Sequence, residues 1–273
     1  MKYVLLLSVL VLAALAPSAA ANPHANPFSY PYGTLPAGKL EVEQYLDLVP
    51  VRVERENPDG TLDGVYGLRS VLTTELEFGI TDRLELGWYF QFRQGASSTT
   101  PFLRFDGVKQ RLHYRFAEAG ELPVDIGVYA ELAEFHNELE FEEKLLLARR
   151  FDALYVVANL WVEQEWYFQT GDTKYIYNPT LGVSYELLPK VIVGAEYWAR
   201  GRFDNATTSA TDPNNSDAPT SAHHYLGPTL LLQTANVFLS LGVYARLDHI
   251  GEPQAVNDPY GKLWVRSIVG LEL

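Results

Sequence analysis

Alternation of apolar and polar residues with a period of two is the feature of this sequence that most limits its fold. In residues 261–273 the odd positions from 263 onward are apolar or small, whereas the even positions include Lys262, Arg266 and Glu272. Residues two apart lie on the same face of a β-strand, so the two sets face opposite ways. The pattern predicts a strand that is apolar on one face and polar on the other.

The same alternation recurs along most of the chain. Residues 84–93, 124–132, 191–200 and 237–248 each place apolar side chains at one parity and polar, charged or glycine residues at the other. We predict about 12 antiparallel strands, an even number as in bacterial barrels. Their expected ranges are 39–53, 64–79, 84–95, 101–117, 122–134, 137–150, 154–170, 174–187, 190–203, 222–233, 237–250 and 262–273.

Short and longer connections tend to alternate between the predicted strands. Tight turns follow the second, fourth, sixth, eighth and tenth strands, whereas three of the other connections are long, at residues 54–63, 204–221 and 251–261. Up-and-down barrels of the outer membrane have short periplasmic turns and longer outer loops. The alternation therefore favours such a barrel over a sandwich and places both ends of the barrel on the periplasmic side.

The N-terminal segment has the layout of a cleaved secretory signal. Lys2 precedes an apolar run that extends to Ala16, and an alanine-rich segment ends at Ala21. We assign residues 1–21 to this signal peptide, residues 22–38 to an irregular N-terminal arm with four prolines, and residues 39–273 to a β-barrel. A loose tail is the default expectation for the arm, although its aromatic residues could tuck into the barrel mouth.

The number of strands limits where the apolar faces can lie. Eight strands already enclose a filled core, so about 12 leave more space than side chains fill. A two-sheet sandwich could bury the same faces, but export and loop alternation favour apolar side chains toward lipid and polar ones toward a lumen.

The formal net charge of −13 offers no broad basic face, so no nucleic-acid partner is expected.

The final strand resembles the closing strand of Gram-negative outer-membrane β-barrels, which ends the chain on an apolar residue preceded by alternating apolar positions. That family usually ends in Phe, and this chain ends in Leu273. The resemblance implies an all-β, membrane-spanning, antiparallel up-and-down barrel in the cell outer membrane. It also implies two partners: outer-membrane lipid, and the barrel-assembly machinery acting through the C-terminal strand.

Charged residues at the polar parity define the candidate site. A solute pathway is predicted along Arg69, Glu75, Glu85, Arg93, Lys109, Arg111, Arg115, Asp125, Glu131, Glu163, Glu196 and Arg246. A basic row beside acidic rows can set a transverse field across a water-filled pore. The leading hypothesis is a porin-like channel for small polar or charged solutes. The same charges could instead pair across strands and fill the lumen together with inward-facing aromatic residues.

Two other functions remain open. One is a non-conducting barrel that binds a ligand or partner through its outer loops, and the other is a lipid-modifying enzyme with Ser and His on the barrel wall. Neither His-x-Ser nor Gly-x-Ser-x-Gly occurs, and we predict no enzyme. No cofactor or metal is predicted, because His223 and His224 would point to opposite faces and residues 204–221 lack the spacing of a calcium loop. We interpret residues 204–221 as a solvated outer loop.

A few residues depart from the pattern. Gln44, Gln110, Gln164 and Glu143 fall on the lipid-facing parity. In the fourth predicted strand the parity switches near residues 106–107, Asp-Gly, where a β-bulge would shift the register.

Overall fold

The computed structural model describes residues 23–96, 103–203 and 222–273, and within these ranges the chain is all β, in one antiparallel sheet. The strands are β1 (Leu40–Glu56), β2 (Leu62–Thr81), β3 (Leu84–Gln94), β4 (Arg104–Arg115), β5 (Asp125–Phe135), β6 (Glu138–Phe151), β7 (Leu154–Tyr167), β8 (Thr173–Tyr177), β9 (Thr180–Leu188), β10 (Val191–Arg202), β11 (His223–Gln233), β12 (Val237–Arg246) and β13 (Leu263–Glu272). In these ranges no helix is long and apolar enough to cross a membrane.

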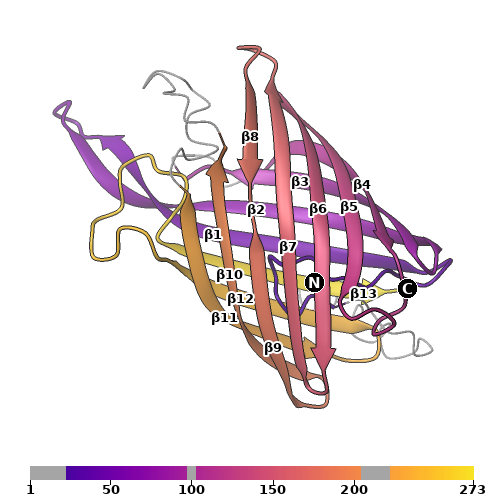
Figure 1. Cartoon of the computed structure of the whole chain (residues 1–273). Coiled ribbons are helices and arrows are strands. Elements are labelled where there is room, and N and C mark those ends of the chain that lie inside the picture. The colour runs from indigo at the N-terminus through magenta and orange to yellow at the C-terminus, as the bar shows by residue number, and fades with distance from the viewer. Residues whose placement is uncertain (1–22, 97–102, 204–221) are drawn as a thin grey trace, which may run out of the picture.

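The sheet closes on itself because β13 pairs antiparallel with β1 (Figure 1). β8 and β9 together occupy one position between β7 and β10, so the thirteen strands form a barrel of twelve strand positions. The sequence predicted a single strand over residues 174–187. It is interrupted at Asn178-Pro179, since proline has no N–H to donate to a ladder.

Burial alternates along the strands with the predicted parity. In β5, for example, Tyr129 and Glu131 are buried, whereas Val128 and Leu132 are 39% and 46% exposed. Polar side chains inside and apolar side chains outside reverse the usual order of a soluble protein. This distribution suits a barrel whose outer face meets lipid and whose interior is polar.

The two rims of the barrel differ in their connections. Glu41 pairs with Glu272, so the first and last strands begin and end at the same rim, which we call the terminal rim. Most connections at this rim are short, including 82–83, 152–153 and 189–190. The other rim, called the loop rim, carries the longer connections 203–222 and 247–262.

The connection between β4 and β5 is longer than the predicted turn at residues 118–121. The turn itself exists, with the N–H of Glu121 donating to the carbonyl of Glu118 at 3.1 Å. Strand pairing stops before it at Arg115 and resumes only at Asp125. Pro123 lies in this gap and cannot donate a ladder hydrogen bond, which accounts for the late start of β5.

The predicted bulge near residues 106–107 is confirmed. Gln91 pairs with Gly107 and Phe92 pairs with Phe105, so Asp106 is the extra residue of β4. Its carboxylate accepts a hydrogen bond of 2.9 Å from the Gln91 side chain. The bulge restores the parity of β4, with the result that Lys109 faces the lumen.

The polar residues predicted on the lipid face do lie there, and two of them find partners on that face. The amide of Gln44 donates to the carbonyl of Thr73 at 2.7 Å and accepts from the Thr74 hydroxyl at 2.9 Å. Gln164 donates to the Tyr175 hydroxyl at 3.1 Å. Such pairing lowers the cost of polar groups that face lipid.

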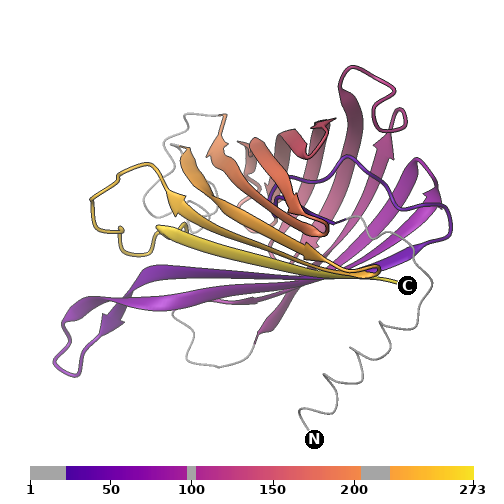
Figure 2. The ribbon, with the colours of Figure 1, turned by 90° about the horizontal axis from the view of Figure 1, so that it is seen from below.

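The N-terminal arm, residues 23–38, differs most from expectation: it is not a loose tail but lies inside the barrel (Figure 2). Phe28, Tyr30, Tyr32 and Leu35 are each at most 8% exposed. The prolines keep the arm out of the sheet, and its backbone N–H groups bond instead to side chains of the barrel wall. The wide lumen of a twelve-position barrel leaves room for this segment.

Candidate functional site

The lumen is divided by the arm and the side chains around it. A cavity of about 220 Å³ lies toward the loop rim, and a second of about 130 Å³ adjoins it near the middle. A third, of about 500 Å³, lies toward the terminal rim. Phe28 and Tyr30 line the middle cavity, whereas Ser29 and Tyr32 line the third. The arm therefore lies between the two ends of the lumen.

The cavity near the loop rim, called the outer cavity, has charges of opposite sign on different walls. Acidic side chains from β6 and β7 form one wall: Glu138, Glu140, Glu142, Glu163 and Glu165. Three basic side chains come from β2, β3 and β13, which lie across the lumen in the closed strand order: Arg69, Arg93 and Arg266. Asp47 of β1 lies on the same side as these arginines, and Lys109 of β4 and Arg200 of β10 complete the charged lining.

Several charges of the outer cavity are paired. Arg200 of β10 contacts Glu163 at 2.8 Å and Glu165 at 2.9 Å. Lys109 contacts Glu131 at 2.8 Å. Arg69 has a different environment: its guanidinium lies 4.9 Å from the Trp264 ring, and its Nε has no hydrogen-bond partner among the described residues.

The middle of the lumen is organised around Arg111, whose side chain is fully buried. Its Nε lies 2.8 Å from Glu75, its Nη1 lies 2.6 Å from Glu85, and its Nη2 donates to Glu77. The guanidinium also lies 4.9 Å from the Tyr30 ring of the arm. The predicted basic row of β4 is thus not free in a pore at this position, because its central arginine is held by three carboxylates of β2 and β3.

Two polar side chains of the wall hold the arm's backbone. Glu196 accepts hydrogen bonds from the N–H groups of Phe28, at 3.1 Å, and Ser29, at 2.5 Å. Asn159 accepts from the N–H of Tyr30 at 2.5 Å and donates to its carbonyl at 3.1 Å. These hydrogen bonds satisfy backbone N–H and C=O groups of a segment that is not paired with any strand.

Further contacts fix the remainder of the arm. The N–H of Leu35 donates to Glu85 at 2.6 Å, and the Tyr30 hydroxyl donates to Glu77 at 3.0 Å. Near the terminal rim, Arg115 donates to the Thr34 hydroxyl at 2.9 Å. The arm is therefore joined by hydrogen bonds both to the Arg111 cluster and to the rim.

All twelve residues predicted for the solute pathway lie on the lumen side of their strands, but in different surroundings. Arg69, Arg93, Lys109 and Glu163 line the outer cavity, and Glu131 lines the middle one. Glu75, Glu85, Arg111 and Glu196 are sealed into the contacts described above. Arg115 and Asp125 lie near the terminal rim, and Arg246 pairs with Asp258 at 2.6 Å on the loop side.

Some lumen residues were absent from that predicted set. Asp47 of β1 holds Arg266 through two contacts of 2.7 Å, and the alternation of β1 and β13 carried the signal for both. His24 is a different case, because the arm has no periodic pattern. Its position next to the wall follows from the tertiary structure alone.

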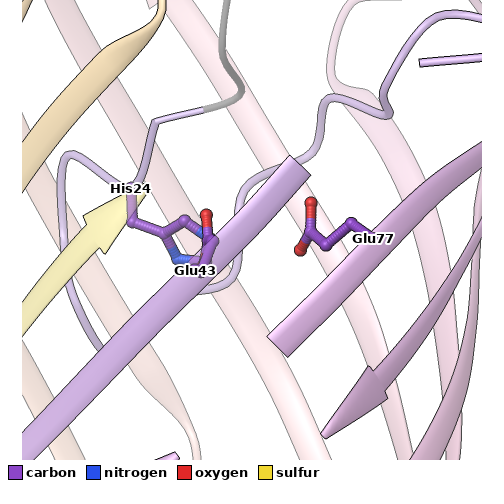
Figure 3. Close-up of side chains that lie close together, drawn as sticks. All are labelled: His24, Glu43 and Glu77. Atoms are coloured by element: carbon purple, nitrogen blue, oxygen red, sulfur yellow. The ribbon is translucent and has the colours of Figure 1, made fainter. Parts of the chain in front are cut away.

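His24 of the arm lies close to Glu43 of β1 and Glu77 of β2 (Figure 3). Its Nε2 is 3.5 Å from Glu43 Oε1. Burial, with a further contribution from the positive charge of Arg111, lowers the pKa of His24 from 6.5 to about 3. The ring is therefore neutral at pH 7, and its contact with Glu43 is not a pair of full charges.

The two adjacent histidines at the start of β11 point in different directions, as predicted. His223 Nδ1 lies 2.9 Å from Asp248, whereas His224 Nδ1 lies 2.7 Å from the Tyr197 hydroxyl. They do not form a chelating pair. The predicted outer loop, residues 204–221, and the predicted signal peptide, residues 1–21, lie outside the described residues.

Comparison with known proteins supports the fold. No protein-family model matches the chain, and no curated protein matches it by sequence. An outer membrane channel from Pseudomonas putida F1 is similar in structure, with a TM-score of 0.58 and 12% identity over 89% of this chain and 98% of the other. The NanC porin gives a TM-score of 0.52 and 8% identity over 85% of this chain and 97% of the other.

At these identities the similarity is one of fold. Together with the apolar outer face and the polar interior, it defines a class of fold: a small outer-membrane β-barrel. This chain is a closed barrel of twelve strand positions, located in the outer membrane, with its N-terminal arm inside the lumen. The two solved structures named above are a channel and a porin.

Proposed function

We propose that this barrel is a porin-like channel for small polar or charged solutes, with the N-terminal arm as its plug. The observation that carries the proposal is the outer cavity of about 220 Å³, in which arginines of β2, β3 and β13 face carboxylates of β6 and β7. Rings and rows of fixed charge select solutes in narrow pores by sign and by dipole. A cavity of this size suits a small molecule rather than a polymer.

Two arginines of the lining, Arg69 and Arg93, are the groups that we expect to receive an anionic group of a solute. Arg69 Nε has no hydrogen-bond partner among the described residues. The Arg93 side chain is 43% exposed, although it contacts Asp106 at 2.7 Å. Guanidinium groups bind carboxylates and phosphates through parallel hydrogen bonds. A group of positive charge on the same solute would face the acidic wall.

Passage through the barrel requires the arm to move. Beyond its chain connection to β1, the arm is held to the wall by hydrogen bonds to Glu196, Asn159 and the Arg111 cluster and by aromatic packing, with no other covalent link. Water can replace such bonds one for one when the segment leaves the lumen, at a modest net free energy for each. We therefore expect a barrel that switches between a plugged and an open form.

Stepwise currents in planar bilayers test this proposal. Deletion of residues 23–38 should give larger and longer-lived conductance steps than the intact chain, since it removes the segment between the cavities. Neutralising Arg69 and Arg93 to Gln in that deleted form should shift the reversal potential toward cation preference. Arg55→Gln, an exposed change in β1 beyond the lumen, serves as the control and should leave selectivity unchanged.

Barrels that insert but remain ion-tight with and without the arm would refute the channel. They would favour the alternative of a non-conducting barrel that binds a partner through its outer loops. In that case deleting residues 204–221 should abolish partner binding while the barrel still inserts.

A further inference from the structure

Two buried carboxylates of the barrel wall each leave one oxygen unpaired beside His24. Glu43 and Glu77 are at most 1% exposed. Glu43 Oε2 accepts from the Tyr45 hydroxyl at 2.5 Å, and Glu77 Oε1 accepts from the Tyr30 hydroxyl at 3.0 Å. Glu43 Oε1 and Glu77 Oε2 have no hydrogen-bond partner among the described residues. A buried carboxylate oxygen without a hydrogen-bond donor or cation beside it has a high free-energy cost.

The region also carries more negative than positive charge. Four carboxylates lie around the single guanidinium of Arg111: Glu43, Glu75, Glu77 and Glu85. Arg111 donates hydrogen bonds from Nε, Nη1 and Nη2 to three of them, Glu75, Glu85 and Glu77. The single Tyr45 hydroxyl proton faces both Glu43 and Glu75. Burying uncompensated carboxylates is strongly unfavourable, so a further cation would stabilise this part of the lumen.

The geometry suits a small metal ion. His24 Nε2 and Glu43 Oε1 are 3.5 Å apart, and the potential ligand atoms of His24, Glu43 and Glu77 all lie within 4.8 Å of one another. Ligand atoms about 2.0–2.2 Å from a tetrahedral zinc ion lie roughly 3.4 Å apart. One pair therefore already has zinc spacing, and a small side-chain rotation of Glu77 would bring in the third atom.

We propose that His24, Glu43 and Glu77 bind a divalent transition-metal ion, best matched by zinc, that fastens the arm to the barrel wall. One imidazole nitrogen and two carboxylate oxygens form a ligand set that zinc accepts and that calcium and magnesium, which prefer oxygen alone, fit less well. Of the three ligands, His24 also lines the middle cavity of about 130 Å³. Figure 3 shows the three side chains, one each from the arm, β1 and β2.

The surrounding hydrogen bonds support this assignment. Tyr45 orients Glu43 through its second oxygen, and Tyr30 and Arg111 do the same for Glu77. Partners of this kind hold metal ligands in place. Since His24 belongs to the arm and both carboxylates belong to the wall, the ion would add a bond between plug and barrel, and metal binding would favour the plugged form.

Zinc titration of the purified barrel in detergent, without a histidine tag, tests the site. The apparent affinity is measured by competition with a chromophoric chelator, and the metal content by elemental analysis. We expect one zinc ion per intact chain. His24→Ala and Glu43→Gln should each weaken binding at least roughly 10-fold. His136→Ala removes an exposed histidine between β5 and β6 and should leave the affinity unchanged.

Chymotrypsin digestion gives a second measure, because Phe28, Tyr30 and Tyr32 are cleavage sites within the arm. Zinc should slow cleavage of the arm in the intact protein and in His136→Ala but not in His24→Ala. His24 lies outside the strands, so this variant should still form a barrel, checked by heat-modifiable gel mobility.

Absence of stoichiometric zinc binding, or equal binding by His24→Ala and the intact chain, would overturn the proposal. Loss of binding in His136→Ala alone would do so too. None of these measurements depends on conduction, so failure of the metal site and failure of the channel proposal are distinguishable.

Discussion

Arg111 lies near the centre of the lumen, where its guanidinium contacts Glu75, Glu77 and Glu85. The sequence pattern predicted that these carboxylates are charged residues facing the lumen. It did not indicate that all three contact one side chain. The convergence exists because β2, β3 and β4 are adjacent: β2 points Glu75 and Glu77 inward, and β3 points Glu85 inward, close to Arg111 of β4. These ion pairs place Arg111 in a buried cluster rather than in a row of free charges.

Replacing Arg111 by Met should destabilise the barrel severely. It leaves three buried carboxylates without their common partner, at a cost of about 3–5 kcal/mol. Urea unfolding in lipid vesicles, followed by tryptophan fluorescence, measures the change. Arg93→Met is the matched control, because the half-exposed contact with Asp106 contributes at most about 1 kcal/mol. Equal unfolding midpoints for the two variants would contradict the prediction.

Glu196 tests the attachment of the arm at the same scale. Glu196→Ala removes the acceptor of two arm N–H groups, and each unpaired buried group costs about 1–3 kcal/mol. The arm should then be cleaved by chymotrypsin several times faster than in the intact chain. Glu186→Ala, which removes a partner of the exposed Arg150, should leave cleavage unchanged. Unaltered protection in Glu196→Ala would mean that other contacts hold the arm.

At the scale of elements, the strand positions were largely predictable and their irregularities only in part. Alternation marks strands because the lumen and the lipid select opposite residues on neighbouring positions. The bulge at Asp106 was visible as a change of parity. The break between β8 and β9 was missed, since Pro179 was included in a continuous strand although it cannot donate to the ladder.

Gly107, next to the bulge, should not tolerate a side chain. A Cβ at this position would lie 2.3 Å from the carbonyl oxygen of Glu134 on β5, so the backbone of one strand would have to shift. We expect Gly107→Ala to lower the free energy of unfolding by about 1–3 kcal/mol. Gly95→Ala, with open space around the added methyl group, should have little effect in the same urea titration. A similar midpoint for both variants would rule out this close approach.

At the scale of the whole molecule, the apolar outer face is what keeps the barrel in the membrane. Leu145, near the middle of β6, is 37% exposed, and Phe151, at its end, is 57% exposed. Arginine on the lipid face costs about 2–4 kcal/mol at the bilayer midplane and about 0–1 near the interfaces. Leu145→Arg should therefore reduce folding into vesicles far more than Phe151→Arg, measured by heat-modifiable gel mobility. An equal loss would argue against a lipid-facing β6.

The candidate site was predictable only to the level of which side chains face inward. The parity of each strand assigned all twelve predicted residues to the lumen, because a strand has only two faces. It could not assign partners, since register and strand neighbours decide that Arg111 meets Glu75 while Arg69 faces a cavity. His24 had no sequence signal, because an irregular segment has no periodicity to interpret.

The sequence by itself determined the class of fold: a period of two, repeated over about 12 segments with alternating loop lengths, is satisfied by a closed barrel with lipid outside and polar groups inside. The tertiary structure decided what fills the barrel. Residues 23–38 lie in the lumen because the wall presents Glu196, Asn159 and Glu85 to their backbone. Such contacts join residues far apart in the chain, and only the closed ring of strands brings them together.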